Sequence, residues 1–235
     1  MRLHLKRLLV PRFWKIPKKL RKWAVAPRPG PHPKEMSIPL LVVVRDLLKL
    51  AETGKEAKKI IKAGEVLVDG RKRKDHKFPV GFMDVVSIPK IKKHYRVGID
   101  QHGLKLVEIK DDEANKKLCR IEDKTIVKGG KTQLNLHDGR NVLVEEDVYK
   151  TGDSILIELP TQKILKHIKL EKDSLAVIIG GQNMGSLVKV KEVIVTRSRE
   201  PNKVTCVKGK EEITAIKDYV FVVGKDKPLV TVVPG

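Results

Sequence analysis

The stretch from Thr53 to Gly70, TGKEAKKIIKAGEVLVDG, constrains the fold of this chain more than any other. Thr53 and Glu56 have the spacing of a capping box, in which each side chain satisfies a backbone N–H at the start of a helix. Gly64 stands where a helix ends in a left-handed residue, and Asp69-Gly70 is a hairpin-turn sequence. The sequence therefore predicts a short helix, a strand and a tight turn.

The helix predicted here is amphipathic, and its outer face is positive. Ala57, Ile60 and Ile61 recur at helical spacing and are expected to pack on the protein, whereas the other side carries Lys55, Lys58, Lys59 and Lys62. The loop directly after the turn holds five cations and one histidine, namely Arg71, Lys72, Arg73, Lys74, His76 and Lys77. The pattern predicts a joint cationic surface, and phosphate backbones are the commonest partner of such a surface.

Most of the net charge lies in the first hundred residues. The chain carries 50 basic and 29 acidic residues, a net charge of +21. Residues 1–36 contribute +10 and residues 37–99 contribute +8, whereas residues 100–170 are neutral and residues 171–235 contribute +3. A lysine- and glutamate-rich surface of the thermophilic kind would raise both signs together, so it does not explain this excess. An anionic partner does, and nucleic acid is the one we expect.

The sequence favours neither a membrane nor a metal as partner. No run reaches the ~18 uncharged apolar residues that a spanning helix needs. The N-terminal stretch LHLKRLLV (3–10) has charges inside any apolar core, unlike a secretory signal. Cys119 and Cys206 have no second Cys or His at metal-ligand spacing, so both are expected to be small buried hydrophobes.

The acidic run Glu145-Glu146-Asp147 is the one stretch that invites a catalytic hypothesis. Successive side chains of a strand point to opposite faces, so three adjacent acids do not converge on one site. We expect an exposed acidic turn there. The sequence predicts no catalytic residue, no metal, no cofactor and no small-molecule substrate.

Changes in composition divide the chain into four segments. Residues 1–36 form a basic extended arm, in which six prolines forbid a long helix. Residues 37–96 form a small α+β module whose first helix is expected to have Pro39 in its first turn and to run to about Ala51. Residues 97–170 are expected to form a central β domain, and residues 171–235 a second one. The predicted fold class is α+β, mostly β.

The arm mixes cations with aromatic side chains, and it holds both tryptophans of the chain. Two interpretations are open for Phe13, Trp14 and Trp23. Burial of these rings pins the arm to the body, which is the simpler interpretation, or the rings stack on unpaired bases while the cations hold phosphates. The RNA-binding candidates of the arm are Arg2, Lys6, Arg7, Arg12, Trp14, Lys15, Lys18, Lys19, Arg21 and Lys22.

The last segment carries a glycine-rich turn between two apolar strands, over Val177 to Val188. A phosphate-binding P-loop would need a lysine before Ser186 and a helix after it, and neither is present. The glycines let the backbone turn tightly and approach RNA closely, and the stretch TRSR (196–199) adds charge. The candidates for RNA contact here are Gly180, Gly181, Gly185, Arg197 and Arg199.

Two of these segments resemble known RNA-binding modules. The stretch 53–70 resembles the αL module shared by bacterial small-subunit ribosomal protein four, several pseudouridine synthases and tyrosyl-tRNA synthetases. Gly54 stands where that family often has Arg, and Lys55 is the candidate replacement. The stretch VIIGGQNMG (177–185) resembles a KOW motif, the strand–loop–strand core of an SH3-like barrel.

The order of the parts is more specific than either module. The whole chain closely resembles small-subunit ribosomal protein four of the archaeal and eukaryotic type. The shared order is a basic arm, the αL module, a neutral β domain and a KOW barrel. The arm carries HLKRL (4–8) and PRFWKIPKK (11–19), and the αL module carries DHKFPVGFMDVVSIP (75–89). The resemblance implies a cytoplasmic, non-enzymatic constituent of the ribosome. Its implied partners are small-subunit ribosomal RNA and neighbouring ribosomal proteins.

The alternative is a transient RNA-binding or RNA-processing factor that uses the same modules. A pseudouridine synthase needs an RLD-like motif and a synthetase needs HIGH and KMSKS signatures, and the sequence has none of these. A transcription elongation factor would account for the KOW motif but for neither the arm nor the αL module.

Overall fold

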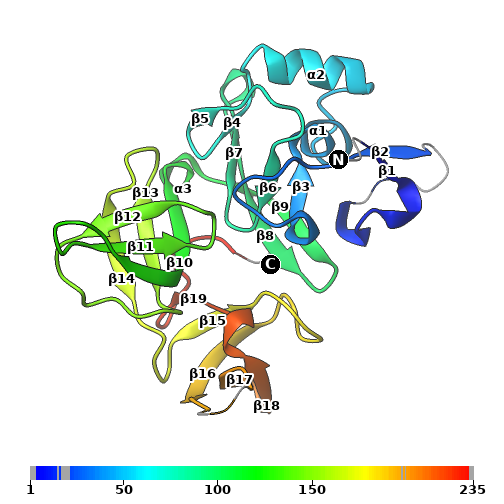
Figure 1. Cartoon of the computed structure of the whole chain (residues 1–235). Coiled ribbons are helices and arrows are strands. Elements are labelled where there is room, and N and C mark those ends of the chain that lie inside the picture. The colour runs from blue at the N-terminus through cyan, green and yellow to red at the C-terminus, as the bar shows by residue number, and fades with distance from the viewer. Residues whose placement is uncertain (1–3, 15, 17–21, 197, 199, 233–235) are drawn as a thin grey trace. The chain divides into compact units, whose positions relative to one another are not determined.

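The computed structural model describes residues 4–14, 16, 22–196, 198 and 200–232. Strands dominate and the helices are short (Figure 1), which confirms the predicted α+β, mostly β class. By internal contacts the chain forms two compact units, one of residues 1–98 and 102–115 and the other of residues 99–101 and 116–235. The four segments drawn from composition stay a prediction. Within the described residues, no helix has the length and apolar character required to span a membrane.

The first unit is built on a five-stranded sheet in the order β5-β4-β7-β8-β9. Its strands are β4 (Leu67–Val68), β5 (Arg71–Lys72), β7 (Val85–Ile88), β8 (Lys93–Asp100) and β9 (Gly103–Ile109). A two-stranded sheet pairs β3 (Ser37–Pro39) with β6 (Pro79–Gly81). The helices are α1 (Leu40–Val42), α2 (Gly54–Lys62) and the one-turn α3 (Asp111–Ala114). This scaffold carries the cationic helix and loop predicted from the sequence.

The predicted helix-and-turn unit forms as expected. The Thr53 hydroxyl accepts the Glu56 N–H at 3.2 Å, and the Glu56 carboxylate accepts the Thr53 N–H at 3.3 Å, so the capping box is complete. Gly64 has a φ of 75° and ends α2. Asp69 and Gly70 have φ values of 53° and 72°, the left-handed pair that a tight hairpin between β4 and β5 requires.

The helix predicted from Pro39 to about Ala51 is shorter and wider than expected, and Pro39 lies in β3 instead of its first turn. It begins as α1 and continues as one turn of π-helix over Val43–Leu47, in which the Leu48 N–H bonds to the Val43 carbonyl. Lys49 then takes a φ of 53°, which a right-handed helix cannot contain. The helical pattern of apolar residues persists beyond the point where the backbone leaves the helix, so the prediction of its end was wrong.

The arm is less extended than its prolines predict. β1 (His4–Lys6) pairs antiparallel with β2 (Trp23–Val25), so the chain folds back on itself, and short 3₁₀ turns lie at Arg7–Leu9 and Arg12–Trp14. Trp14 is 1% exposed and its indole N–H donates to the Ser37 carbonyl at 2.9 Å. These long-range contacts, which the sequence pattern does not encode locally, hold the arm on the first unit.

His32 is a second anchor of the arm, and it depends on a glycine. His32 Nε2 lies 3.0 Å from both carboxylate oxygens of Asp84, and the Gly81 N–H donates to that carboxylate at 2.9 Å. The imidazole lies flat against Gly81, where an added Cβ would overlap the ring. All three residues are buried.

We expect Gly81→Ala to lower the free energy of unfolding by about 1–3 kcal/mol, the usual cost of overpacking a filled core. Thermal or urea denaturation measures the loss. In a His32→Ala background the same substitution should cost clearly less, because the ring that it strikes is gone. Equal losses in both backgrounds would show that His32 does not limit the space at Gly81.

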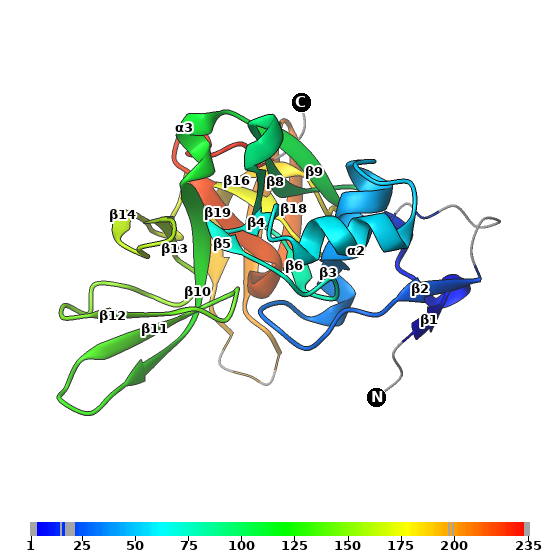
Figure 2. The same cartoon turned by 90° about the horizontal axis from the view of Figure 1, so that it is seen from above.

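The second unit contains two antiparallel sheets, each with its own cluster of buried apolar residues. The first has the order β12-β11-β10-β13-β14. Its strands are β10 (Lys116–Ile126), β11 (Thr132–Leu136), β12 (Asn141–Val144), β13 (Ser154–Glu158) and β14 (Ile164–Ile168). Figure 2 shows β10 as one long strand; residues 116–120 pair with β13, and most of the remainder pairs with β11. The predicted strand in TGDSILIELP is β13.

The C-terminal sheet has the order β18-β17-β16-β15-β19. Its strands are β15 (Leu175–Ile178), β16 (Leu187–Ile194), β17 (Lys203–Lys208), β18 (Glu211–Ile216) and β19 (Val220–Gly224). β15 and β16 pair antiparallel across the glycine-rich turn, as predicted for the KOW stretch. Ala176, Val190 and Cys206 lie in the core of this sheet. Cys119 and Cys206 are both buried and unbridged, which confirms their expected role as small hydrophobes.

Candidate nucleic-acid interface

The outer face of α2 presents four lysines over a buried apolar base. Ala57 and Ile61 are fully buried beneath the helix, and the lysines at positions 55, 58, 59 and 62 are exposed. A shallow hollow of about 530 Å³ lies among these lysines, bordered by Thr53 and Glu56. Since packing and capping use the apolar and N-terminal residues, the lysine ammonium groups are available to a partner.

The 71–77 loop lies beside this helix, as predicted. The side chains of Lys72 and Lys74 come within 3.7 and 3.8 Å of the place where a Cβ at Gly64 would stand, so both pass over the C-terminal end of α2. Partial burial lowers the pKa of His76 below its ordinary value, and the positive charge of Lys58 lowers it further. His76 is therefore mainly neutral near pH 7, and the lysines and Arg71 supply the charge.

Most of these cations have no acidic counterpart. Across the part of the chain that the structure describes, no carboxylate forms an ion pair with any of seven exposed cations: Lys55, Lys58, Lys59, Lys62, Arg71, Lys72 and Lys74. Asp75, the one acid in the loop, pairs instead with Arg28 at 3.2 Å. Like charges crowded in this way repel one another, and an anionic partner relieves the repulsion. We call these seven residues the α2–loop surface.

Two cationic residues of the loop are partly engaged in the fold. The Arg73 guanidinium lies 4.3 Å from the centre of the Phe78 ring, and its backbone N–H donates to the Val66 carbonyl. Lys77 is half-buried, and its backbone N–H donates to the Asp75 carboxylate at 2.9 Å. These contacts fix the shape of the loop that presents the exposed cations.

The arm candidates separate into structural and accessible residues. Lys6 and Lys22 are exposed, whereas the Arg7 guanidinium donates to the Ile16 carbonyl and holds a turn of the arm. Trp14 is buried, which supports the pinning interpretation and leaves its ring no open face for a base. Several predicted contacts lie outside the described residues: Arg2, Lys15, Lys18, Lys19, Arg21, Arg197, Arg199 and the side chain of Arg12.

The three glycines of the C-terminal turn have different roles. A Cβ at Gly180 would lie 2.8 Å from the Tyr219 ring, so this glycine makes room for the tyrosine. Gly181 and Gly185 both have a φ of 81°, which favours glycine, and Gly181 is exposed. The turn closes through a 2.8 Å hydrogen bond from the Gly185 N–H to the Ile178 carbonyl. Of the three positions, Gly181 leaves backbone open to a partner.

Three known families match successive parts of the chain. The RS4NT domain matches residues 1–35, the S4 domain matches residues 38–86, and Ribosomal family S4e matches residues 91–164. The small ribosomal subunit protein eS4 of Archaeoglobus fulgidus is 52% identical over 97% of both chains. The chain belongs to the eS4 family of small-subunit ribosomal proteins. The S4-domain match covers both α2 and the 71–77 loop.

Other eS4 proteins and a solved structure agree with this assignment. The eS4 protein of Methanothermobacter thermautotrophicus is 50% identical over 100% of this chain and 97% of its own length. The crystal structure of the 30S ribosomal protein S4e from Thermoplasma acidophilum is 32% identical and superposes with a TM-score of 0.71, covering 82% of this chain and 97% of that one. The similarity therefore extends over the arm and both units.

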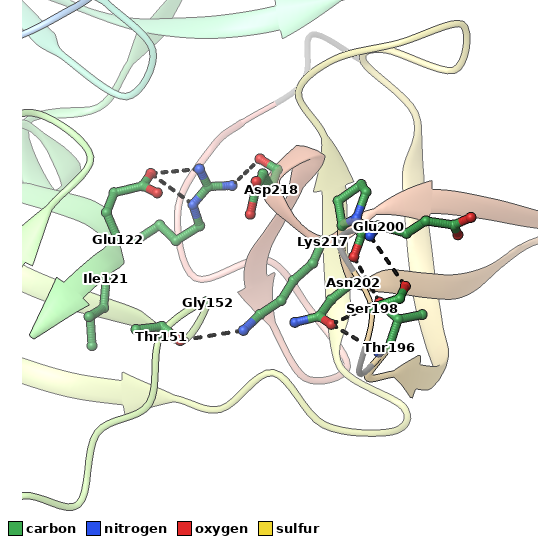
Figure 3. Close-up of a pocket in the computed structure, with 12 residues that line it drawn as sticks. Ile121, Glu122, Thr151, Gly152, Thr196, Ser198, Glu200, Asn202, Lys217 and Asp218 are labelled. Atoms are coloured by element: carbon green, nitrogen blue, oxygen red, sulfur yellow. Dashed lines mark hydrogen bonds and ion pairs between the residues drawn. The ribbon is translucent and has the colours of Figure 1, made fainter.

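A polar pocket of about 430 Å³ in the second unit is not evident from the sequence (Figure 3). The Arg120 guanidinium donates to the Glu122 carboxylate at one side, and Lys217 Nζ lies 3.4 Å from the Thr151 hydroxyl. Thr196 and Asn202, from the turn that contains TRSR, hydrogen-bond to each other at the opposite wall. The lining residues come from four separate stretches, so no sequence spacing signals the pocket.

One cluster in the second unit has the residue types of a metal site, but lysine and arginine side chains already lie beside its carboxylate. Cys119, His137 and Asp138 lie within ligand distance of one another, brought together by the β10–β11 hairpin. The Asp138 carboxylate already contacts the Lys117 ammonium at 2.7 Å and Arg140 at 3.3 Å, and His137 Nδ1 accepts the Arg120 N–H at 3.2 Å. Two cations already in contact with the Asp138 carboxylate oppose the binding of a third, so the cluster is structural. The acids at 145–147 are all exposed, as predicted.

Proposed function

We propose that this protein is a structural constituent of the small ribosomal subunit that binds small-subunit ribosomal RNA. Its eS4 relatives are named as proteins of that subunit. The observation that supports RNA binding by this chain is the α2–loop surface, with seven exposed cations on one side of the first unit and no described carboxylate paired with any of them. An RNA backbone is the polyanion that matches such a surface.

The role is positional and not chemical. The major groove of A-form RNA is too deep and narrow for side chains to read, so lysines on a rigid helix recognise the spacing of phosphates. Each phosphate neutralised contributes roughly 0.7–0.9 to the slope of log affinity against log salt. Cations of the arm, Gly181 and the residues of the TRSR turn would add contacts elsewhere. We infer no catalytic activity, and we expect neighbouring ribosomal proteins as the other partners, on the cytoplasmic ribosome.

Sedimentation of a cell lysate tests the proposal against a transient RNA-binding or RNA-processing role. We expect the protein to run with the small-subunit peak of a sucrose gradient at moderate salt and to stay there at high salt. An integral constituent is held by many phosphate contacts and by protein neighbours, so one salt step does not release it. A protein that runs free, or that leaves the peak as salt rises, would instead be a transient factor.

A further inference from the structure

The two tryptophans of the arm differ sharply in exposure. Trp14 is 1% exposed and hydrogen-bonded, but Trp23 is 51% exposed. Indoles carry a large apolar surface and are usually covered in a free protein. Trp23 therefore contributes little to pinning the arm, and its ring is open to a partner.

The pairing of β1 with β2 shows what lies beside the indole. Lys6 is directly opposite Trp23 and Leu5 is opposite Ala24. Residues that face each other across antiparallel strands share one face of the ribbon, and their Cβ atoms lie about 4.5–5.5 Å apart. Ala24 is buried, so its face of the ribbon is the inner one. The outer face brings the half-exposed indole next to an exposed lysine, and Lys22, also exposed, precedes Trp23 in the chain.

We propose that Trp23 stacks on an unpaired nucleobase of small-subunit ribosomal RNA while Lys6 and Lys22 bind the adjoining phosphates. This inference rests on the proposed function and names one RNA feature that the protein recognises. An aromatic ring on the open face of a β-ribbon, flanked by cations, is a general platform for single-stranded nucleotides. Among residues 1–36 the only acid is Glu35, so little in this segment repels a phosphate.

A protein neighbour is the competing occupant. Leu8 is 88% exposed and Leu9 is 67% exposed, and both lie in the 3₁₀ turn that follows β1, so an apolar surface of a ribosomal protein would also find contacts here. The charge favours RNA, because a protein groove that covers the indole must also accept the neighbouring lysines. The two occupants give different results with RNA alone.

Tryptophan fluorescence tests the stacking directly, because the chain has only these two tryptophans. Full-length wild type, Trp23→Phe and Trp23→Ala are titrated with small-subunit ribosomal RNA from Archaeoglobus fulgidus, the source of a 52% identical relative. We expect RNA to quench a large part of the wild-type emission and to leave the Trp23→Phe emission, which comes from Trp14 alone, unchanged. Trp23→Ala should bind about tenfold more weakly, and Trp23→Phe should keep most of the affinity because it keeps a ring.

The outcomes separate this inference from the proposed function. Wild type that binds the RNA with unchanged emission, and Trp23→Ala that binds equally well, would overturn the stacking and leave RNA binding intact. In that case a loss of Trp23→Ala from small subunits in cells would indicate a protein partner for the indole. Wild type that fails to bind the RNA at all would overturn both proposals. Melting temperatures of the variants, expected to match wild type because Trp23 is half exposed, control for misfolding.

Discussion

Replacing Lys58, Lys59 and Lys62 by glutamine will weaken binding to small-subunit ribosomal RNA and flatten its salt dependence. All three ammonium groups are exposed on α2 beside the 71–77 loop. If each contacts one phosphate, the slope of log affinity against log salt should fall by about 2 to 3. Filter binding or anisotropy at several salt concentrations measures the slope.

Glutamine is the informative replacement because it removes charge without disturbing the helix. Lys59 and Lys62 lie in the last turn of α2, where carboxylates would oppose the helix dipole and lower stability for reasons unrelated to RNA. The loss of favourable dipole interactions is partly offset by relief of repulsion among the lysines. The melting temperature of the glutamine variant should therefore stay close to that of wild type.

A matched variant in the second unit separates specific contact from net charge. Lys128, Lys131 and Lys163 are exposed, and their replacement by glutamine changes the net charge by the same amount. Within the described residues the one ion pair lost, between Lys131 and Glu145, is exposed and contributes little. An equal loss of slope in both triple variants would mean that α2 contributes only to the overall charge.

The sequence predicts the α2 unit well because its determinants are local. The capping pair lies three residues apart, and the hairpin turn needs only two residues with left-handed backbones. The end of this helix was missed because Lys49 takes a left-handed backbone, while the apolar residues around it, Leu47 and Leu50, still follow helical spacing. The start of a helix is therefore easier to predict from local sequence than its end, because tertiary packing decides where the helix stops.

The roles of the two tryptophans depend on long-range contacts that no sequence spacing encodes. Both lie among lysines and prolines, yet Trp14 reaches a carbonyl 23 residues away and Trp23 faces outward on a strand. The polar pocket around Lys217 and the cluster around Asp138 likewise join residues from separate stretches. Composition predicted the kind of partner, and tertiary structure selects which side chains can meet it.

Replacing Lys117 by methionine will strongly destabilise the second unit. Lys117 is fully buried, and its ammonium lies 2.7 Å from the Asp138 carboxylate. The Asp138 side chain is only 2% exposed. Removing one partner of a buried ion pair costs about 3–5 kcal/mol, because the other charge stays in a poorly solvating interior. Urea unfolding measures the loss, and Lys116→Met, at the exposed neighbouring position, is the control with little expected effect.

The same pair makes stability depend on pH. Burial alone would raise the pKa of Asp138, but Lys117, together with His137 and Arg140, outweighs it and lowers the pKa to about 2. The Asp138 carboxyl thus binds its proton less tightly in the native state than in the unfolded chain, where the pKa of an Asp is about 3.9. The stabilisation is complete above about pH 4 and is lost as the pH falls toward 2. In Asp138→Asn this part of the acid destabilisation should disappear.

A double variant distinguishes the ion pair from simple packing. In Lys117→Met/Asp138→Leu neither member of the Lys117–Asp138 pair is left behind, and Arg140, which also loses its contact with Asp138, keeps some exposure to water. The loss should therefore be smaller than that of Lys117→Met alone. If the loss in the double variant equals the sum of the losses in Lys117→Met and Asp138→Leu, Lys117 acts through the volume that it fills and not through the carboxylate. If the losses do not add, Lys117 acts by neutralising the buried Asp138 carboxylate. This basic protein would then use one of its lysines in the interior, where RNA cannot reach it. There the lysine holds β10 against the turn that follows β11.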